Sequence, residues 1–407
     1  MSQLIKTTRR TRRSAVGALL ACVSLVAVGG CAARAQADAI GAQASGIQII
    51  PAGSGSAAAA PIAITERAAT PTRAATGAPT APAAGHARVV SVVPGRLSVG
   101  SVPGVGYVVS VSGGYRMVLA SGARLELGGA WSAVPYGSAG ALVWSSPDLT
   151  DFGSLSVVGS GPGGSDPAGR VTTVPVVDHE GRVALWRASG SGGVLEQRSA
   201  SGAVLASVTT AAGPVGYVVT GQVGAGRVLA TRVQGAASGG DGVVSDGVVL
   251  TSAQGELRTV PGMVQGLVAS ESAGLYAGVT RVIDGQIPVR CSQVRRVVDD
   301  SVVWSSCEDR VPAAFSPDGR YVALLPAADG LGFGDVTVVD LSSGREVLRV
   351  KLATSGVAFE SNSSLLMPVA AEKAGASGIV RCTVSGVCER ADTAFLSTAD
   401  GYLVNAQ

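Results

Sequence analysis

The apolar residues between about residue 95 and the C-terminus come in short Val- and Ala-rich runs, separated by clusters of Gly, Ser, Asp and Pro. Short apolar runs bounded by such residues are typical of β-strands joined by tight turns. The sequence contains 57 Gly, and hydrophobic residues make up 46% of it. This composition supplies both the turns and a large core, so we expect an all-β domain.

One stretch contains a complete unit of four strands. A first strand ends at Phe315, the turn Ser-Pro-Asp-Gly319 follows, and further strands are expected in RYVALLP, DVTVVD and REVLRV, with Ser-Ser-Gly344 between the last two. Gly tolerates the positive φ that such turns require, and Asp caps its own backbone. The pattern predicts a four-stranded antiparallel meander.

The same unit recurs along the chain. VDHEGRVALW (177–186) aligns with residues 315–324 and places Gly181 at the position of Gly319, and residues 359–367 repeat the pattern. Turns before the last strand are expected at Gly122, Gly202, Gly255, Gly344 and Gly386, and near 161–163 and 299–300. Seven turns roughly 40–53 residues apart indicate a β-propeller of about seven four-stranded blades. A β-sandwich array is the alternative, but seven similar meanders without a linker argue against it.

The Ser-Pro-Asp-Gly unit resembles the repeats of TolB-like and tryptophan–aspartate-repeat propellers. One blade, 315–350, matches well and the others are degenerate; a Gly-His…Trp-Asp pair is absent, which favours the TolB-like group. The resemblance covers roughly residues 95–407 and concerns fold, not activity. Residues 107–128 look like a blade without its first strand, and residues 395–404 look like the start of a blade at which the chain stops. We therefore expect the C-terminal strand to complete the first blade.

The N-terminus has the pattern of an export signal. The basic run KTTRRTRR precedes an apolar stretch from Ala15 to Val28, which is short for a membrane-spanning helix. It ends in Val28-Gly-Gly-Cys31, which resembles the lipobox of bacterial lipoproteins. The resemblance implies cleavage before Cys31 and a diacylglyceryl group on its thiol. The alternative is an ordinary signal peptide cut near residues 33–35, which would give a secreted protein.

The same N-terminal segment bears on the export route and on the net charge of the mature chain. Thr11-Arg12-Arg13 resembles a twin-arginine signal, but the usual large apolar residue after the pair is missing, so general and twin-arginine export both stay open. The first 30 residues contain five of the 31 basic residues and no acidic one, which leaves 26 basic and 28 acidic residues. Because the mature chain is nearly neutral, we expect no nucleic-acid partner.

Residues 32–87 are rich in Ala, Pro, Gly, Ser and Thr and contain no aromatic residue. Such a segment buries too little apolar surface to offset its ordering entropy, and its repeated Pro and Gly disfavour an Ala-rich helix. We expect a disordered linker with ends about 40 Å apart. The predicted organisation is a signal peptide (1–30), lipidated Cys31 with its tether (31–87) and a propeller domain (88–407).

Two of the six cysteines, Cys22 and Cys31, belong to the signal and the anchor. The other four allow three pairings. The alternative of a four-Cys zinc site fits poorly, because zinc ligands usually come in short pairs such as CxxC.

The repeat register selects one pairing. Cys291 and Cys307 lie symmetrically about the turn at 299, and Cys382 and Cys388 lie symmetrically about 385. Each pair therefore faces across the last hairpin of its blade, where opposed residues come close enough to bond. We expect two disulfides, which persist outside the cytoplasm.

No catalytic constellation stands out. The two His are His86, in the tether, and His179, at a blade turn, so a His-based triad or metal site would depend on His179 alone. We interpret His179 as a solvated turn residue, and the acidic pairs 299–300 and 308–309 as solvated charge. The sequence predicts neither a metal nor a cofactor.

Trp131, Trp144, Trp186 and Trp304 lie in or near apolar runs and are interpreted as blade core; a ring of aromatic residues that grips a sugar is the alternative. We expect a non-enzymatic lipoprotein, anchored at the outer face of the cytoplasmic membrane, whose propeller binds an envelope protein or cell-wall ligand through the face with the inter-blade loops. The alternatives are a propeller enzyme acting on a polysaccharide or peptide, and a structural or sensory element. No ligand-binding residue is predicted.

Overall fold

The computed structural model describes residues 87–403 with gaps. The residues outside the description are 1–86, 112–113, 129–131, 137–138, 146–152, 161–169, 172–174, 179, 190–191, 211–214, 225, 235–243, 253, 284–288, 328–333, 355, 370–377, 392–400 and 404–407. The predicted signal peptide, Cys31 and most of the tether therefore lie outside the described residues, as do His86, His179, Trp131 and the turn expected near 161–163.

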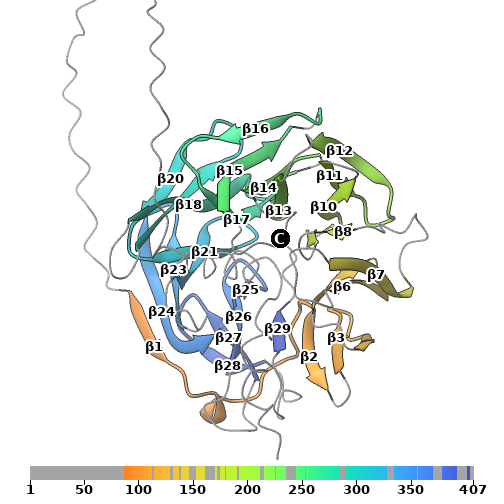
Figure 1. Cartoon of the computed structure of the whole chain (residues 1–407). Coiled ribbons are helices and arrows are strands. Elements are labelled where there is room, and N and C mark those ends of the chain that lie inside the picture. Colours follow the sequence, from red (N-terminus) through yellow and green to blue (C-terminus); the bar gives the residue numbers. More distant parts are fainter. Residues whose placement is uncertain are drawn as a thin grey trace, which may run out of the picture.

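Seven antiparallel blades stand around a common axis (Figure 1). Blades 1 to 4 consist of β29 (Gly401–Leu403), β2 (Tyr107–Val111), β3 (Gly114–Val118) and β4 (Arg124–Gly128); β5 (Ser132–Tyr136), β6 (Ala139–Ser145), β7 (Gly153–Ser160) and β8 (Arg170–Val171); β9 (Val176–Val177), β10 (Val183–Ser189), β11 (Gly192–Arg198) and β12 (Val204–Thr210); and β13 (Val215–Gln222), β14 (Val228–Gln234), β15 (Val244–Thr251) and β16 (Leu257–Val260).

Blades 5 to 7 consist of β17 (Gln265–Ser270), β18 (Leu275–Ile283), β19 (Val289–Arg296) and β20 (Val302–Ser306); β21 (Arg310–Phe315), β22 (Tyr321–Pro326), β23 (Gly334–Asp340) and β24 (Arg345–Thr354); and β25 (Ala358–Phe359), β26 (Ser364–Val369), β27 (Gly378–Thr383) and β28 (Cys388–Arg390). Outside the blades lie β1 (Arg88–Ser91) and the short 3-10 helix η2 (Pro94–Arg96). The predicted all-β propeller with seven four-stranded blades is thus confirmed.

The C-terminal strand closes the ring. β29 pairs with β2, and Leu403 stands opposite Tyr107 and Gly401 opposite Val109. Three residue pairs therefore join the last described strand to the first blade, which is the closure expected from the incomplete blade at residues 107–128.

The predicted turn glycines have a positive φ, a backbone conformation that other residues rarely adopt. Gly122, Gly202, Gly255 and Gly386 have φ of 82°, 83°, 81° and 85°, and each donates its N–H to the carbonyl three residues earlier. Left-handed φ carries no steric cost for Gly. In blade 5 Asp300 replaces Gly at this position, with φ of 57°.

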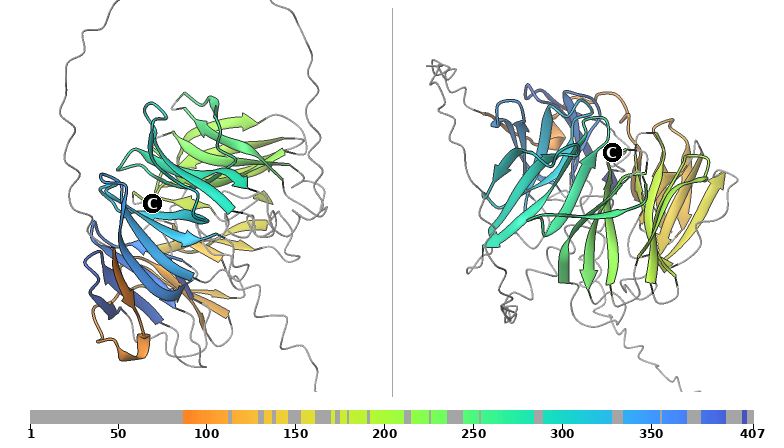
Figure 2. Two further views of the ribbon diagram at one scale, coloured as in Figure 1. Left: turned by 90° about the vertical axis from the view of Figure 1, so that its left-hand side faces the viewer. Right: turned by 90° about the horizontal axis from the view of Figure 1, so that it is seen from above.

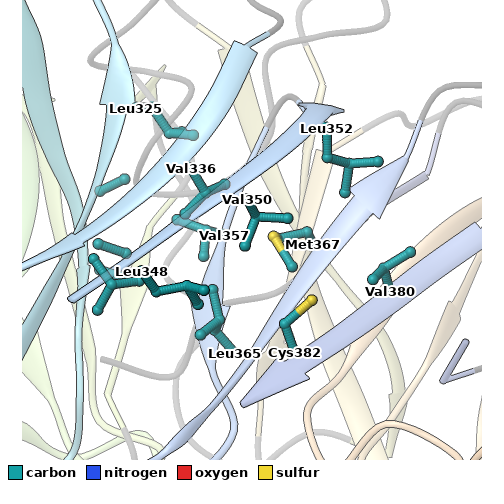
Figure 3. Packing of buried hydrophobic residues seen from close by; sticks show 14 of the residues in the cluster. Leu325, Val336, Leu348, Val350, Leu352, Val357, Leu365, Met367, Val380 and Cys382 are labelled. Atoms are coloured by element: carbon teal, nitrogen blue, oxygen red, sulfur yellow. The ribbon is translucent and has the colours of Figure 1, made fainter. Parts of the chain in front are cut away.

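The core lies between neighbouring blades. Between blades 6 and 7, alternate residues of β24 face alternate residues of β26, and Leu348, Val350, Leu365 and Met367 are all fully buried (Figure 3). Burying a side chain of this kind contributes about 1.5–3 kcal/mol.

Tryptophans take part in the same kind of packing elsewhere in the ring. Trp144 and Trp186 are buried in the cores of blades 2 and 3, as interpreted from the sequence. Trp304 is partly buried against the cluster between blades 5 and 6.

Candidate functional site

The two faces of the propeller differ in the length of their connections. The connections from first to second strand and from third to fourth strand leave the same face, which we call the turn face (Figure 2). They are two to five residues long, apart from residues 161–169. Short connections of this kind leave little room for a site built from loops.

The opposite face, which we call the long-connection face, carries the connections from second to third strand. In four blades these connections span seven to nine residues: 146–152, 235–243, 327–333 and 370–377. The connection 284–288 of blade 5 has five residues. Apart from Ala327 these connections lie outside the described residues, but the strand ends that hold them are described.

A buried arginine fixes two of these strand ends between blades 5 and 6. The Arg290 guanidinium donates to the carbonyl of Ala327 at 2.8 Å, and its Nη1 lies 3.8 Å from the Asp309 carboxylate. That carboxylate also accepts the Arg290 backbone N–H at 3.1 Å. The ends of the connections 284–288 and 327–333 are therefore held together, with Glu308 exposed beside them.

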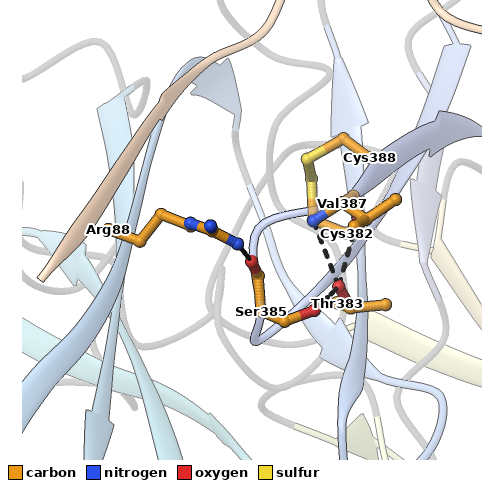
Figure 4. The surroundings of a disulfide bond; sticks show 6 residues. All are labelled: Arg88, Cys382, Thr383, Ser385, Val387 and Cys388. Atoms are coloured by element: carbon orange, nitrogen blue, oxygen red, sulfur yellow. Dashed lines mark hydrogen bonds between the residues drawn. A yellow bond between two sulfur atoms is a disulfide. The ribbon is translucent and has the colours of Figure 1, made fainter.

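A disulfide joins the adjoining strand ends of blade 5. Cys291 bonds to Cys307, because Ser292 pairs with Ser306 and the next residues stand directly opposite each other. Cys382 bonds to Cys388 across the last hairpin of blade 7 (Figure 4). This is the pairing expected from the symmetry of the cysteines about the predicted turns.

A buried ion cluster lies on the turn face between blades 3 and 5. Arg182 Nε donates to Asp178 Oδ2 at 2.6 Å, and the same guanidinium pairs with Glu180 at 3.2 Å and with Glu271 of blade 5. The Asp178 side chain is 0% exposed and its other oxygen accepts the backbone N–H of Glu180 and Arg182. Arg182 thus neutralises a carboxylate that water does not reach.

Two buried glutamines extend this network to blade 4. Gln222 Nε2 donates to the carbonyls of Val176 and Arg182, at 2.9 and 2.8 Å, and its Oε1 accepts from Gln197 at 2.6 Å. Gln197 Oε1 in turn accepts the N–H of Gly226. These hydrogen bonds satisfy the buried amide groups of both glutamines and so link blades 3 and 4.

The turns of the later blades bind one another as well. Ser272 of blade 5 donates to the carbonyl of Pro317 in blade 6 at 2.6 Å, and the Asp318 N–H donates to Asn362 of blade 7 at 3.1 Å. Together with the pair between Arg182 and Glu271, these contacts connect the first turns of blades 3, 5, 6 and 7. The polar groups of the turn face therefore stabilise the ring itself.

The sequence predicts solvated charge at Asp300, and the structure differs from this prediction. Its carboxylate binds the Arg258 guanidinium of blade 4, with Nη2 to Oδ1 at 3.0 Å, and accepts the Tyr276 hydroxyl at 2.6 Å. The hydrogen bond from Arg258 holds the pKa of Asp300 below its ordinary value, against the opposing effect of burial. The prediction of solvated charge is also wrong for Asp309, which pairs with Arg290.

We predict that Asp300→Asn lowers the stability at pH 7 by about 1 kcal/mol, because half-exposed pairs contribute little. Asn tolerates the left-handed backbone, so mainly the charge is lost. A lowered native pKa stabilises the fold above the unfolded pKa, and this contribution disappears as the pH falls through the native pKa. Urea unfolding at pH 7 and at about pH 2 checks this; an equal difference between variant and wild type at both pH values contradicts it.

Among the described residues, no three His, Cys, Asp or Glu side chains are grouped so that they could hold a metal ion. In the same part of the chain, we find no helix with the length and apolar character needed to cross a membrane.

No family model and no curated protein matches the sequence. Among solved structures, the chain is similar to TolB from Acinetobacter baumannii, with 9% identity over 74% of this chain and 83% of that chain and a TM-score of 0.38. It is also similar to the β-propeller domain of the Trilobed protease from Pyrococcus furiosus, with 8% identity over 63% of this chain and 83% of that chain and a TM-score of 0.36. A third similar structure is Porphyromonas gingivalis dipeptidyl peptidase 4, with 11% identity over 77% of this chain and 54% of that chain and a TM-score of 0.45.

Proposed function

We propose that this protein is an exported lipoprotein whose propeller is a binding scaffold in the cell envelope. The long-connection face is the contact surface for a protein or cell-wall ligand. The difference between the two faces carries the proposal. The polar groups of the turn face bind one another, whereas the opposite face carries four connections of seven to nine residues, and Arg290 fixes a strand end at one of them. Binding residues are usually placed on loops that a rigid scaffold positions.

The position of β1, where the described chain enters the propeller, supports this choice of face. β1 runs parallel to β24, with Arg88 opposite Leu348, so β1 begins near the end of β24 that follows the turn at 341–344. Arg88 also donates to the Ser385 carbonyl in a turn of blade 7 (Figure 4). A tether from Cys31 would therefore reach the propeller on its turn-face side and leave the long-connection face free.

Lipidation of Cys31 is tested by intact mass. We expect the mature chain from a membrane fraction to begin at Cys31 and to carry diacylglyceryl mass, and Cys31→Ser to release the protein from the membrane. Two features support the proposal: the lipobox-like Val28-Gly-Gly-Cys31, and two disulfides, which form in oxidising compartments. A mature chain that begins after Cys31, or carries no lipid, contradicts it.

Binding is tested by cross-linking in intact cells followed by purification of the full-length chain. We expect one partner or one cell-wall fraction to be retained, and the retained material to bind the purified wild-type protein again. Cleavage of peptidoglycan or of peptide substrates by the purified chain would instead favour the alternative, a propeller enzyme.

A further inference from the structure

We infer that the segment from Arg88 to Val105, which we call the clasp, is a second closure of the ring. It joins the point where the tether enters to the seam, defined as the pairing of β29 with β2. Figure 1 shows the clasp in orange, outside β24 and β28, before the chain enters β2. The clasp therefore spans blades 6 and 7 and ends in blade 1.

Backbone hydrogen bonds attach the clasp at two places. β1 makes four parallel residue pairs with β24, and the Val92 N–H extends them to the carbonyl of Lys351. Further along, Val99 bridges Arg390 of β28; the Gly100 N–H donates to the Arg390 carbonyl and the Arg390 N–H donates to that of Ser98, both at 2.8 Å. The clasp thus covers the outer strand edges of two neighbouring blades.

Apolar side chains hold the first half of the clasp against the blades. Val92 is buried in the cluster between blades 6 and 7, and Val90 and Leu97 pack against the same cluster. At Gly386, in the last turn of blade 7, a Cβ atom would lie 2.4 Å from the Arg88 side chain and 3.0 Å from Val90. The close contact between β1 and this turn therefore depends on a residue without a side chain.

One arginine of β27 holds the second half. The Arg381 guanidinium donates to the carbonyls of Ser101 and Val102, both at 3.2 Å, and to the Ser101 hydroxyl at 3.0 Å. It also pairs with Glu360 and Glu389 of blade 7, and Glu360 accepts the Gly104 N–H. Arg381 is 9% exposed, so its partners in the clasp shield it from water.

Because of these contacts, opening of the seam depends on release of the clasp. The seam itself has three residue pairs in the described strands, and β2 begins two residues after the clasp ends. Release of the clasp frees the outer edge of blade 7 and the start of β2 together, and so opens the ring between blades 7 and 1.

The test is hydrogen exchange of the full mature chain carrying Arg381→Gln. Arg187→Gln in blade 3 is the matched control, because Arg187 also binds a buried carboxylate, Glu196, but is far from the clasp in the ring. We expect Arg381→Gln to speed exchange about tenfold or more in residues 98–105 and also in β2 and β29, with β13 and β14 unchanged. The control should leave the seam unchanged.

Faster exchange confined to residues 98–105, or no change at all, overturns the inference. A second variant covers the case in which Arg381→Gln does not fold. Gly100→Pro removes the N–H that donates to the Arg390 carbonyl, which loosens the clasp on β28 and substitutes no residue of the blades. It should speed exchange at the seam as well, and normal protection of β2 and β29 in this variant contradicts the coupling.

Discussion

Arg182→Met is expected to lower the free energy of unfolding by about 3–5 kcal/mol. The substitution removes the guanidinium that faces Asp178, whose side chain is fully buried and also accepts two backbone N–H groups. A buried carboxylate without its cation either stays charged in a low dielectric or takes up a proton, and both cost free energy. Urea unfolding followed by tryptophan fluorescence measures the loss.

The control for this substitution is Arg116→Met, which removes the half-exposed pair with Glu126 in blade 1. Pairs of this kind contribute less than about 1 kcal/mol. The double variant Asp178→Asn, Arg182→Met should be more stable than Arg182→Met alone, because the uncompensated charge is gone. Equal losses for Arg182→Met and Arg116→Met would show that the buried cluster does not hold the turn face together.

Leu348→Ala should cost about 2–5 kcal/mol, through lost apolar burial and the cavity that remains. Leu348 is fully buried between blades 6 and 7, in the layer with Val350, Leu365 and Met367 (Figure 3). Leu205→Ala in β12 is the control, since Leu205 is 47% exposed and its loss should change stability by about 0.5 kcal/mol or less. The same urea titration compares them, and a loss for Leu348→Ala as small as the control's would place the core elsewhere.

Much of the ring could be predicted because its signals are local and recur. Gly181 and Gly319, aligned from sequence, have φ of 73° and 67° in equivalent turns. The cysteine pairs could be predicted for a similar reason, since a hairpin turn fixes which residues stand opposite each other. The closing strand followed from an incomplete first blade and an extra strand at the end of the chain.

The polar contacts between blades could not be predicted in this way. Arg182 and Glu271 belong to different blades, and Ser101 and Arg381 lie 280 residues apart, so no period relates them. Asp300 illustrates the limit: the sequence located its turn, but not the Arg258 side chain 42 residues away that neutralises it. The clasp leaves no signal either, because its residues follow no repeat.

The assignment of the two faces is tested most directly with a photo-cross-linking residue placed in intact cells at Glu308, on the long-connection face, or at Gln254, on the turn face. Both positions are exposed at the surface. We expect a discrete adduct from position 308 and none from position 254. Adducts from position 254 alone, or equally from both, would contradict a binding surface opposite the tether.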